Sequence, residues 1–274
     1  MKCVVDSNIL QTHELRQFLS RSKTNSAVFP DYAFMEAVKD DTLASVFKSL
    51  AVLAEYPEQV IVLKTTMAVC GLHGGSRGLQ RRLVDVPRTR EFAVFCRALG
   101  NARQGDPTMQ GELLRLGREA TTHLESVRSD AIAFSKIGEE TSKMFTREEQ
   151  HLLRTGRRVS PEVLRKIVLA CVWQSEVLFV NHPAVKRLPT QTELPNTYIF
   201  RSSLSHLLLV LKWATDGGTS TNPAKVRNSM VDAHFAAYST YFDTLLSKDA
   251  TAVLVAGQAR TILAQLQQPG LRRG

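Results

Sequence analysis

The sequence has few cysteines and no long apolar run, and each absence excludes a class of protein. There are four cysteines: Cys3, Cys70, Cys96 and Cys171. They form no Cys-x-x-Cys pair, and no histidine spacing completes a zinc site. We therefore expect reduced cysteines, buried as small apolar side chains. The longest apolar stretches, near Leu204–Leu211 and Ile167–Val180, fall short of the roughly 18 uninterrupted residues that a membrane span requires, so no transmembrane helix is expected.

Aromatic residues and recognised enzyme motifs are also scarce. Aromatics make up 7% of the 274 residues, so the core should be aliphatic. No Gly-x-Ser-x-Gly nucleophile motif occurs, which disfavours serine-hydrolase chemistry. The glycine-rich stretch Gly71–Gly78 lacks the ending of a P-loop, and we interpret it as a connection rather than a phosphate cradle. Asp6 stands where a secretory signal needs its apolar region, so a cytoplasmic protein is expected.

Positive charge is in excess and is concentrated in the middle of the chain. The sequence has 35 Lys or Arg and 26 Asp or Glu, a net charge of +9. Between Arg77 and Arg187 there are 20 basic and 13 acidic residues, so seven of the nine surplus charges lie there. Such a balance favours polyanionic partners such as nucleic acid, although basic helices also occur on proteins that bind none.

The pattern of apolar residues predicts an α/β protein with a helical middle. Strands are predicted at Lys2–Asp6, Val60–Leu63 and Thr244–Ser247. Helices are predicted at Ile9–Leu19, from Pro30-Asp31 onward, and at Leu204–Ala214, Val231–Tyr241 and Ala252–Leu266, with a loop at Asp216–Pro223 and a disordered tail after Leu266. No strand is predicted in the middle segment, where Thr146–Glu149 fits a capping box and Ser160 fits a helix N-cap.

Two of the predicted strands are followed by acidic residues. Asp6 closes the first strand, and Asp249 follows the last. Because the carboxyl ends of parallel strands meet at one edge of a sheet, we expect both acids to lie there. Clustered carboxylates repel one another unless a cation neutralises them, and their oxygens suit Mg²⁺ or Mn²⁺.

Four segments resemble the motifs of the PIN-domain nucleases in order and spacing. The first is Val4-Val5-Asp6-Ser7-Asn8, and the second is Val28–Glu36. The third is Asn228–His234, which carries Asp232, and the fourth is Asp243–Asp249. The resemblance implies that metal-coordinating and catalytic carboxylates are Asp6, Glu36, Asp232 and Asp249, with Asn8, Asp243 and Ser247 as supporting residues.

The resemblance also implies a fold and a division of the chain. It implies a PIN-like parallel sheet of four or five strands, flanked by helices. Glu36 and Asp232 are 196 residues apart, too far for a compact PIN domain, so residues 77–187 are expected to form a helical insertion. Residues 1–76 and 188–274 would then form the PIN-like domain.

The function implied by the resemblance is that of a Mg²⁺- or Mn²⁺-dependent endonuclease, with RNA favoured over DNA and a role as a toxin or defence ribonuclease. Candidate nucleic-acid contacts are Arg77, Arg81, Arg82, Arg154, Arg157 and Arg158. Two alternatives stay open: an inactive PIN-like module that binds RNA or a protein partner, and an enzyme acting on a small phosphorylated metabolite. A second copy of the chain and an inhibitor protein are the other partners considered, and no membrane partner is expected.

Overall fold

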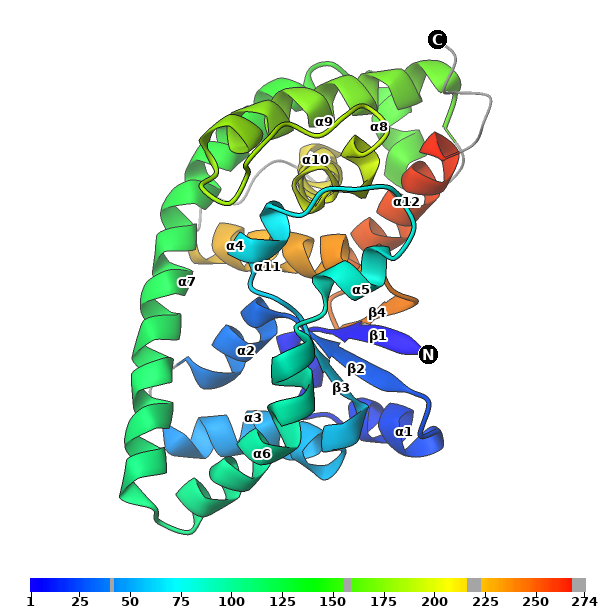
Figure 1. The fold of residues 1–274 in the computed structure, drawn as a ribbon. Helices are drawn as coiled ribbons and strands as arrows, with labels where there is room; N and C mark the ends of the chain where they lie inside the picture. Colours follow the sequence, from blue (N-terminus) through cyan, green and yellow to red (C-terminus); the bar gives the residue numbers. More distant parts are fainter. Residues whose placement is uncertain (40–41, 155–158, 216–222, 268–274) are drawn as a thin grey trace. The chain divides into compact units, whose positions relative to one another are not determined.

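The computed structural model describes residues 1–39, 42–154, 159–215 and 223–267, with the backbone alone at 127–139, 154, 215 and 223–225 (Figure 1). The chain forms two compact units. The first comprises residues 1–66, 83–127 and 242–249, and the second comprises residues 67–82, 128–241 and 250–274. The boundaries between these units differ from the expected ones after residues 76 and 187. The helical insertion of residues 77–187 stays a prediction.

The first unit is built on a four-stranded parallel sheet. Its strands are β1 (Lys2–Val5), β2 (Ser26–Phe29), β3 (Val60–Val62) and β4 (Thr244–Leu246), in the order β3-β2-β1-β4. The inner strands β1 and β2 each bury their last three residues, as expected for strands covered on both faces. The expected α/β class with a parallel sheet of four strands is therefore confirmed.

Helices surround this sheet and connect its strands. They are η1 (Ser7–Ile9), α1 (His13–Arg21), α2 (Asp31–Val38), α3 (Leu43–Glu55), η2 (Pro57–Gln59), α6 (Val86–Arg103) and the first part of α7 (Pro107–Ser142). Helix α6 packs against β3, and α3 packs against both α2 and α6. The predicted helix at Ile9–Leu19 begins later, at His13, because the Thr12 side chain accepts a hydrogen bond from the Leu15 amide and caps it there.

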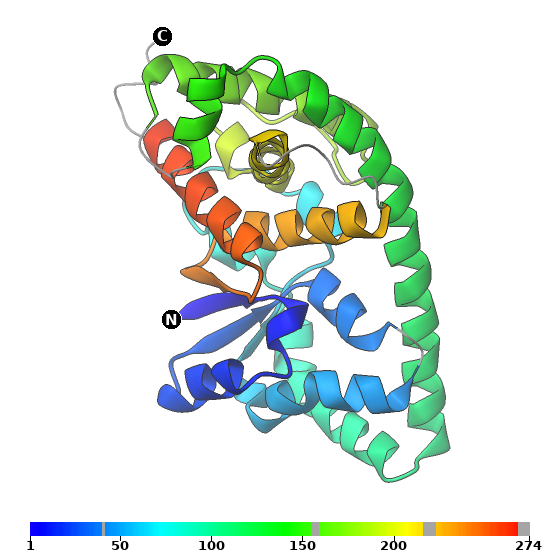
Figure 2. The ribbon, with the colours of Figure 1, turned by 180° about the vertical axis from the view of Figure 1, so that it is seen from behind.

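In its described part, the second unit contains helices and loops and no strand. It contains most of α4 (Thr66–Cys70) and α5 (Leu79–Leu83), the end of α7, α8 (Arg147–Arg154), α9 (Pro161–Asn181), η3 (Leu194–Asn196), α10 (Tyr198–Thr215), α11 (Pro223–Ser239) and α12 (Ala250–Leu266). Helix α10 is its centre and packs against α8, α9, α11 and α12. Figure 1 shows α10 end-on, and Figure 2 shows α11 and α12 side by side.

The helix signals in the middle of the chain are confirmed. Thr146 and Glu149 form the reciprocal capping box, in which each side chain accepts a hydrogen bond from the other's backbone amide. Ser160 caps α9 through its Oγ, which accepts a hydrogen bond from the Val163 amide. In the described part of residues 77–187 the one β-type pairing is a single bridge from Val84 to Leu63. The predicted loop at Asp216–Pro223 and the predicted disordered tail fall almost wholly outside the described residues.

Two predictions about local structure are wrong. The helix predicted from Pro30-Asp31 counts Leu43 among its apolar residues, but α2 ends at Val38 and a separate helix, α3, starts at Leu43. Asp232 was predicted near the start of a helix beginning at Val231, but α11 begins at Pro223, so Asp232 lies in its middle. Proline at the first helical position suits the fixed backbone angle and missing N–H of that residue, which explains the earlier start.

Candidate active site

Strands β1 and β4 place the residues that follow them at one edge of the sheet. The two strands are far apart in the sequence but pair directly, with Val5 opposite Leu246 (Figure 1). The Asp6 amide continues the pairing by donating to the Leu246 carbonyl at 3.0 Å. The segments Asp6–Asn8 and Ser247–Asp249 therefore start side by side at this edge.

The Asp6 carboxylate is buried and held by hydroxyl and amide donors. Asp6 is 1% exposed. Its Oδ2 accepts hydrogen bonds from Ser247 Oγ at 2.5 Å and Asn8 Nδ2 at 2.6 Å. Its Oδ1 has longer contacts, from Ser7 Oγ at 3.3 Å and the Asn8 amide at 3.5 Å. Burial raises the pKa of Asp6 above its ordinary value, and the hydrogen bonds from Ser247, Asn8 and Ser7 oppose that rise.

Asn8 and Ser247 connect the two segments to each other. Asn8 Nδ2 also donates to Ser247 Oγ at 3.2 Å, and Asn8 Oδ1 accepts the Lys248 amide at 2.9 Å. Ser247 Oγ accepts the Asp249 amide at 2.9 Å. The structure thus places the two predicted supporting residues directly against Asp6, and their bonds fix both the Asp6 carboxylate and the backbone that leads to Asp249.

Glu36 and Asp243, two other predicted residues of the first unit, have partners outside this network. Glu36, on α2, forms an ion pair with Lys39, with 2.5 Å between Oε2 and Nζ, and its side chain is 13% exposed. Asp243 precedes β4 and accepts a hydrogen bond from the Lys2 amide at 2.7 Å, so it supports the start of β1 rather than the end. Within the described residues, no three His, Cys, Asp or Glu side chains are placed to hold a metal ion together. Asp232 belongs to the second unit, and its role as a ligand stays a prediction.

Sequence analysis missed a third acid at a strand end. Asp31 follows β2 after Pro30. Its Oδ2 accepts the Thr66 amide at 2.6 Å, and its Oδ1 accepts Thr66 Oγ1 at 2.7 Å and the Tyr32 amide at 2.9 Å. Burial raises its pKa, and the hydrogen bonds from Thr66 oppose that rise. Asp31 thus joins the segments that follow β2 and β3. The signal was present, because Pro30-Asp31 ends an apolar stretch, but β2 itself was not recognised.

Only some of the arginines predicted to contact nucleic acid lie among the described residues. Arg77 and Arg81 are exposed side chains of the second unit. Arg82 is half-buried and donates to the carbonyls of Gly75 at 2.6 Å and Arg77 at 2.7 Å, so its guanidinium organises the adjacent loop. Arg157 and Arg158 lie outside the described residues, and only the backbone of Arg154 is described.

Comparisons with known proteins add no family to this description. No protein-family model, curated protein or solved structure matches the chain. In the described part of the chain, no helix combines the length and the apolar character that a membrane span requires. The functional interpretation therefore depends on the chain's own residues.

Proposed function

We propose that the protein is a metal-dependent nuclease of PIN-like fold that hydrolyses phosphodiester bonds of nucleic acid, with RNA as the expected substrate. The observation that carries the proposal is the buried Asp6 carboxylate, which Asn8 and Ser247 hold at the edge of the sheet. The Asp249 amide binds the same Ser247 hydroxyl. A buried carboxylate is costly to keep unless it is paired or coordinates a cation, and burial raises its pKa accordingly.

The donor set suits a hard divalent cation. Mg²⁺ is commonly bound through one or two carboxylates together with water and substrate phosphates, so a cage of three protein ligands is not required. Asp6 Oδ2 is occupied by two short hydrogen bonds, whereas Oδ1 has only long contacts and keeps capacity for a cation. A bound Mg²⁺ or Mn²⁺ supplies Lewis-acid polarisation of the phosphate and a more acidic water.

The candidate site residues and the exposed arginines have distinct roles in this proposal. Asp6 is the main ligand, and Asp249 is the second. Asn8 and Ser247 hold the Asp6 carboxylate in one orientation, as polar groups behind metal ligands generally do. Glu36 is assigned as a further ligand, for which its ion pair with Lys39 has to open. Exposed basic side chains such as Arg77 and Arg81 would contact phosphates without reading sequence.

One observation favours the alternative function, an inactive PIN-like module that binds RNA or a protein partner. Among the described residues, the acids do not gather into a three-ligand group, and Glu36 is neutralised by Lys39. Such a module would keep affinity for RNA, or for its protein partner, without cleaving RNA.

The test is hydrolysis of labelled single-stranded RNA and DNA by the full chain with Mn²⁺ or with chelator. We expect metal-dependent cleavage that falls on the order of 100-fold or more in Asp6→Asn and in Asp249→Asn. Glu58→Gln is the matched control, since Glu58 is an exposed acid of the same unit, and it should cleave like the wild type. Asp232→Asn tests the fourth predicted ligand.

The other outcomes of the same assay exclude the proposal. Equal cleavage by wild type and Asp6→Asn would indicate a contaminating nuclease. Retained RNA binding without cleavage would favour the binding module. Hydrolysis of mononucleotides without affinity for polynucleotides would instead indicate an enzyme for small phosphorylated metabolites.

A further inference from the structure

A cavity of about 780 Å³ lies within the second unit. Its volume is in the range of small-molecule sites, which span roughly 300–1,000 Å³. The residues that line it come from four parts of that unit: the loop at Gly75-Ser76, the first half of α9, the segment from Gln191 to Phe200, and the end of α12. None of the residues assigned to the proposed nuclease site lines this cavity.

Apolar and polar side chains both line the cavity. Helix α9 contributes Leu164, Val168 and Leu169, and the last of these is 62% exposed. The loops contribute the hydroxyl or amide side chains of Ser76, Gln191, Thr192 and Asn196. A ligand with an apolar body and a polar end would match both kinds of side chain.

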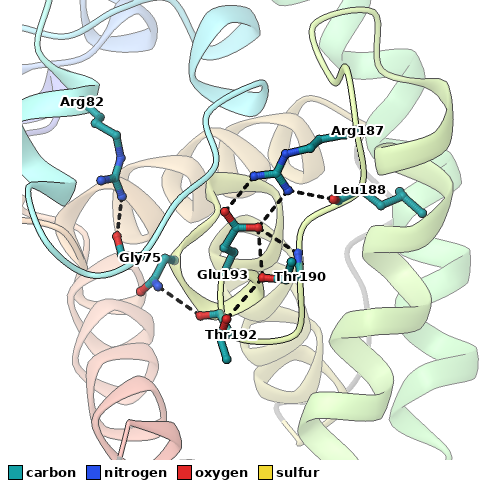
Figure 3. A network of polar contacts seen from close by, with 8 residues as sticks. Gly75, Arg82, Arg187, Leu188, Thr190, Thr192 and Glu193 are labelled. Carbon is teal, nitrogen blue, oxygen red and sulfur yellow. Dashed lines mark hydrogen bonds and ion pairs between the residues drawn. The ribbon is translucent and has the colours of Figure 1, made fainter.

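Both polar loops are held in place by charged side chains. Arg82 donates to the carbonyls of Gly75 and Arg77, and Gly74 has a φ of 133°, a conformation that favours glycine. On the other loop, Arg187 forms a two-pronged ion pair with Glu193, at 2.8 and 2.9 Å (Figure 3). Glu193 Oε2 also accepts the Thr190 amide at 2.9 Å and the Thr190 hydroxyl at 3.0 Å. These bonds order the loop that carries Gln191 and Thr192.

Buried side chains hold η3, which also lines the cavity, through hydrogen bonds to its backbone carbonyls. Arg201 is 3% exposed and donates from Nε to the Pro195 carbonyl at 2.9 Å. The Tyr241 hydroxyl donates to the Asn196 carbonyl at 3.0 Å. The Arg201 guanidinium lies 3.9 Å from the centre of the Tyr241 ring, a cation–π contact. The cavity is thus preformed, because side-chain bonds fix two of its four lining parts, the Gly75 loop and the segment from Gln191 to Phe200.

Among the described residues that line the cavity, the charge is positive and no acid is present. Arg165, on α9, is the one charged side chain among the described residues that line it. Arg165 is exposed and forms no ion pair or hydrogen bond with the described ranges of the chain. On the adjoining loop, Glu193 forms an ion pair with Arg187. A cation beside an apolar wall is complementary to an anion that carries an apolar body.

We propose that this cavity binds a small amphipathic anion, a compound with an aliphatic or aromatic body and one carboxylate, sulfonate or phosphate group that pairs with Arg165. The apolar body lies against α9, and the polar loops supply hydrogen bonds to its head group. This binding site is independent of the proposed nuclease activity.

The test uses the fluorescent aromatic sulfonate 1-anilinonaphthalene-8-sulfonate with the full chain. We expect saturable binding at one site, weakened about tenfold or more by Arg165→Glu, since a charge-assisted contact is lost and a repulsive one is introduced. Arg147→Glu is the matched control, because Arg147 is an exposed arginine of the same unit that does not line the cavity, and its affinity should be unchanged. Arg165→Gln is a milder second variant, and thermal unfolding confirms that each variant is folded.

Displacement of the dye by competing ligands distinguishes the contribution of the anionic group from that of the apolar chain. Decanoate should displace the dye, and decanol of equal chain length should do so at least tenfold less well. Equal displacement by both, or equal dye affinity in Arg165→Glu and the wild type, would overturn the proposal. The dye could also adhere to the exposed apolar residues of α9 outside the cavity, Trp173, Val177 and Val180. Loss of the signal in Trp173→Ser but not in Arg165→Glu would therefore also refute it.

Discussion

Replacement of Ser247 by alanine should destabilise the protein by about 2 kcal/mol at neutral pH. The hydroxyl donates to the buried Asp6 carboxylate at 2.5 Å, and a hydrogen bond to a charged group contributes roughly 1.5–3 kcal/mol. It also accepts hydrogen bonds from the Asp249 amide and from Asn8 Nδ2. Ser247 is half-buried, so water can replace part of what those two donors lose.

The cost of Ser247→Ala should also depend on pH. Burial raises the pKa of folded Asp6, and the bond from Ser247 is the largest influence that lowers it again. Without that bond the folded pKa rises further above the unfolded value of roughly 3.9. The folded chain then holds a proton that the unfolded chain releases, so stability is lost as the pH rises through this window. The free energy of unfolding of the alanine variant should therefore be closer to that of the wild type at pH 4 than at pH 7.5.

Urea unfolding at the two pH values measures this difference. Ser20→Ala is the matched control, since the exposed Ser20 hydroxyl donates to the Gln17 carbonyl in its own helix. In an Asp6→Asn background the cost of Ser247→Ala should shrink, because the two changes remove the same charged pair. An equal cost at both pH values, together with additive single and double variants, would refute the assigned role of Ser247.

Two further predictions concern other buried polar groups. His206 is buried and its pKa is lowered to about 4, so between pH 6.5 and 4 the unfolded chain takes up a proton that the folded chain does not. Stability should fall by about 3 kcal/mol over that range as the pH decreases, and His206→Gln should flatten this loss in urea titrations. Thr66→Val removes the hydroxyl bond to Asp31 and should cost about 1–3 kcal/mol, whereas Thr122→Val, which loses only a bond to its own helix, should cost less than 1 kcal/mol. Equal costs for the two threonine variants would contradict the importance of the Asp31 contact.

Local sequence patterns predicted most of the sheet and its acid-bearing edge. Uninterrupted apolar runs located β1, β3 and β4, and the rule that parallel strands share one carboxyl edge brought Asp6 and Asp249 to neighbouring strands. Strand β2 was not recognised because its apolar run is only three residues long and leads directly into Pro30. Asp31 was missed for the same reason, since an acid is recognised at a strand end only when the strand is recognised.

Features that depend on distant segments could not be predicted from local patterns. The cavity in the second unit joins Gly75, Gln191 and Leu266, which no periodicity relates. The ion pair of Glu36 with Lys39 is local, yet the motif gave Glu36 a different partner, a metal ion. The placement of Asp232 within α11 depended on where that helix begins, and helix boundaries are the least certain part of a sequence pattern.

The pairing of β1 with β4 has a consequence for the newly made chain. Lys2–Val5 is translated before its partner strand, so one of its edges stays unpaired until Thr244–Leu246, more than two hundred residues later, has been made. Until that segment leaves the ribosome, this edge has no strand with which to exchange backbone hydrogen bonds, which makes it a template for wrong associations. Completion of the sheet is therefore a late, long-range closure, and synthesis of this protein should be sensitive to chaperones that shield nascent strands.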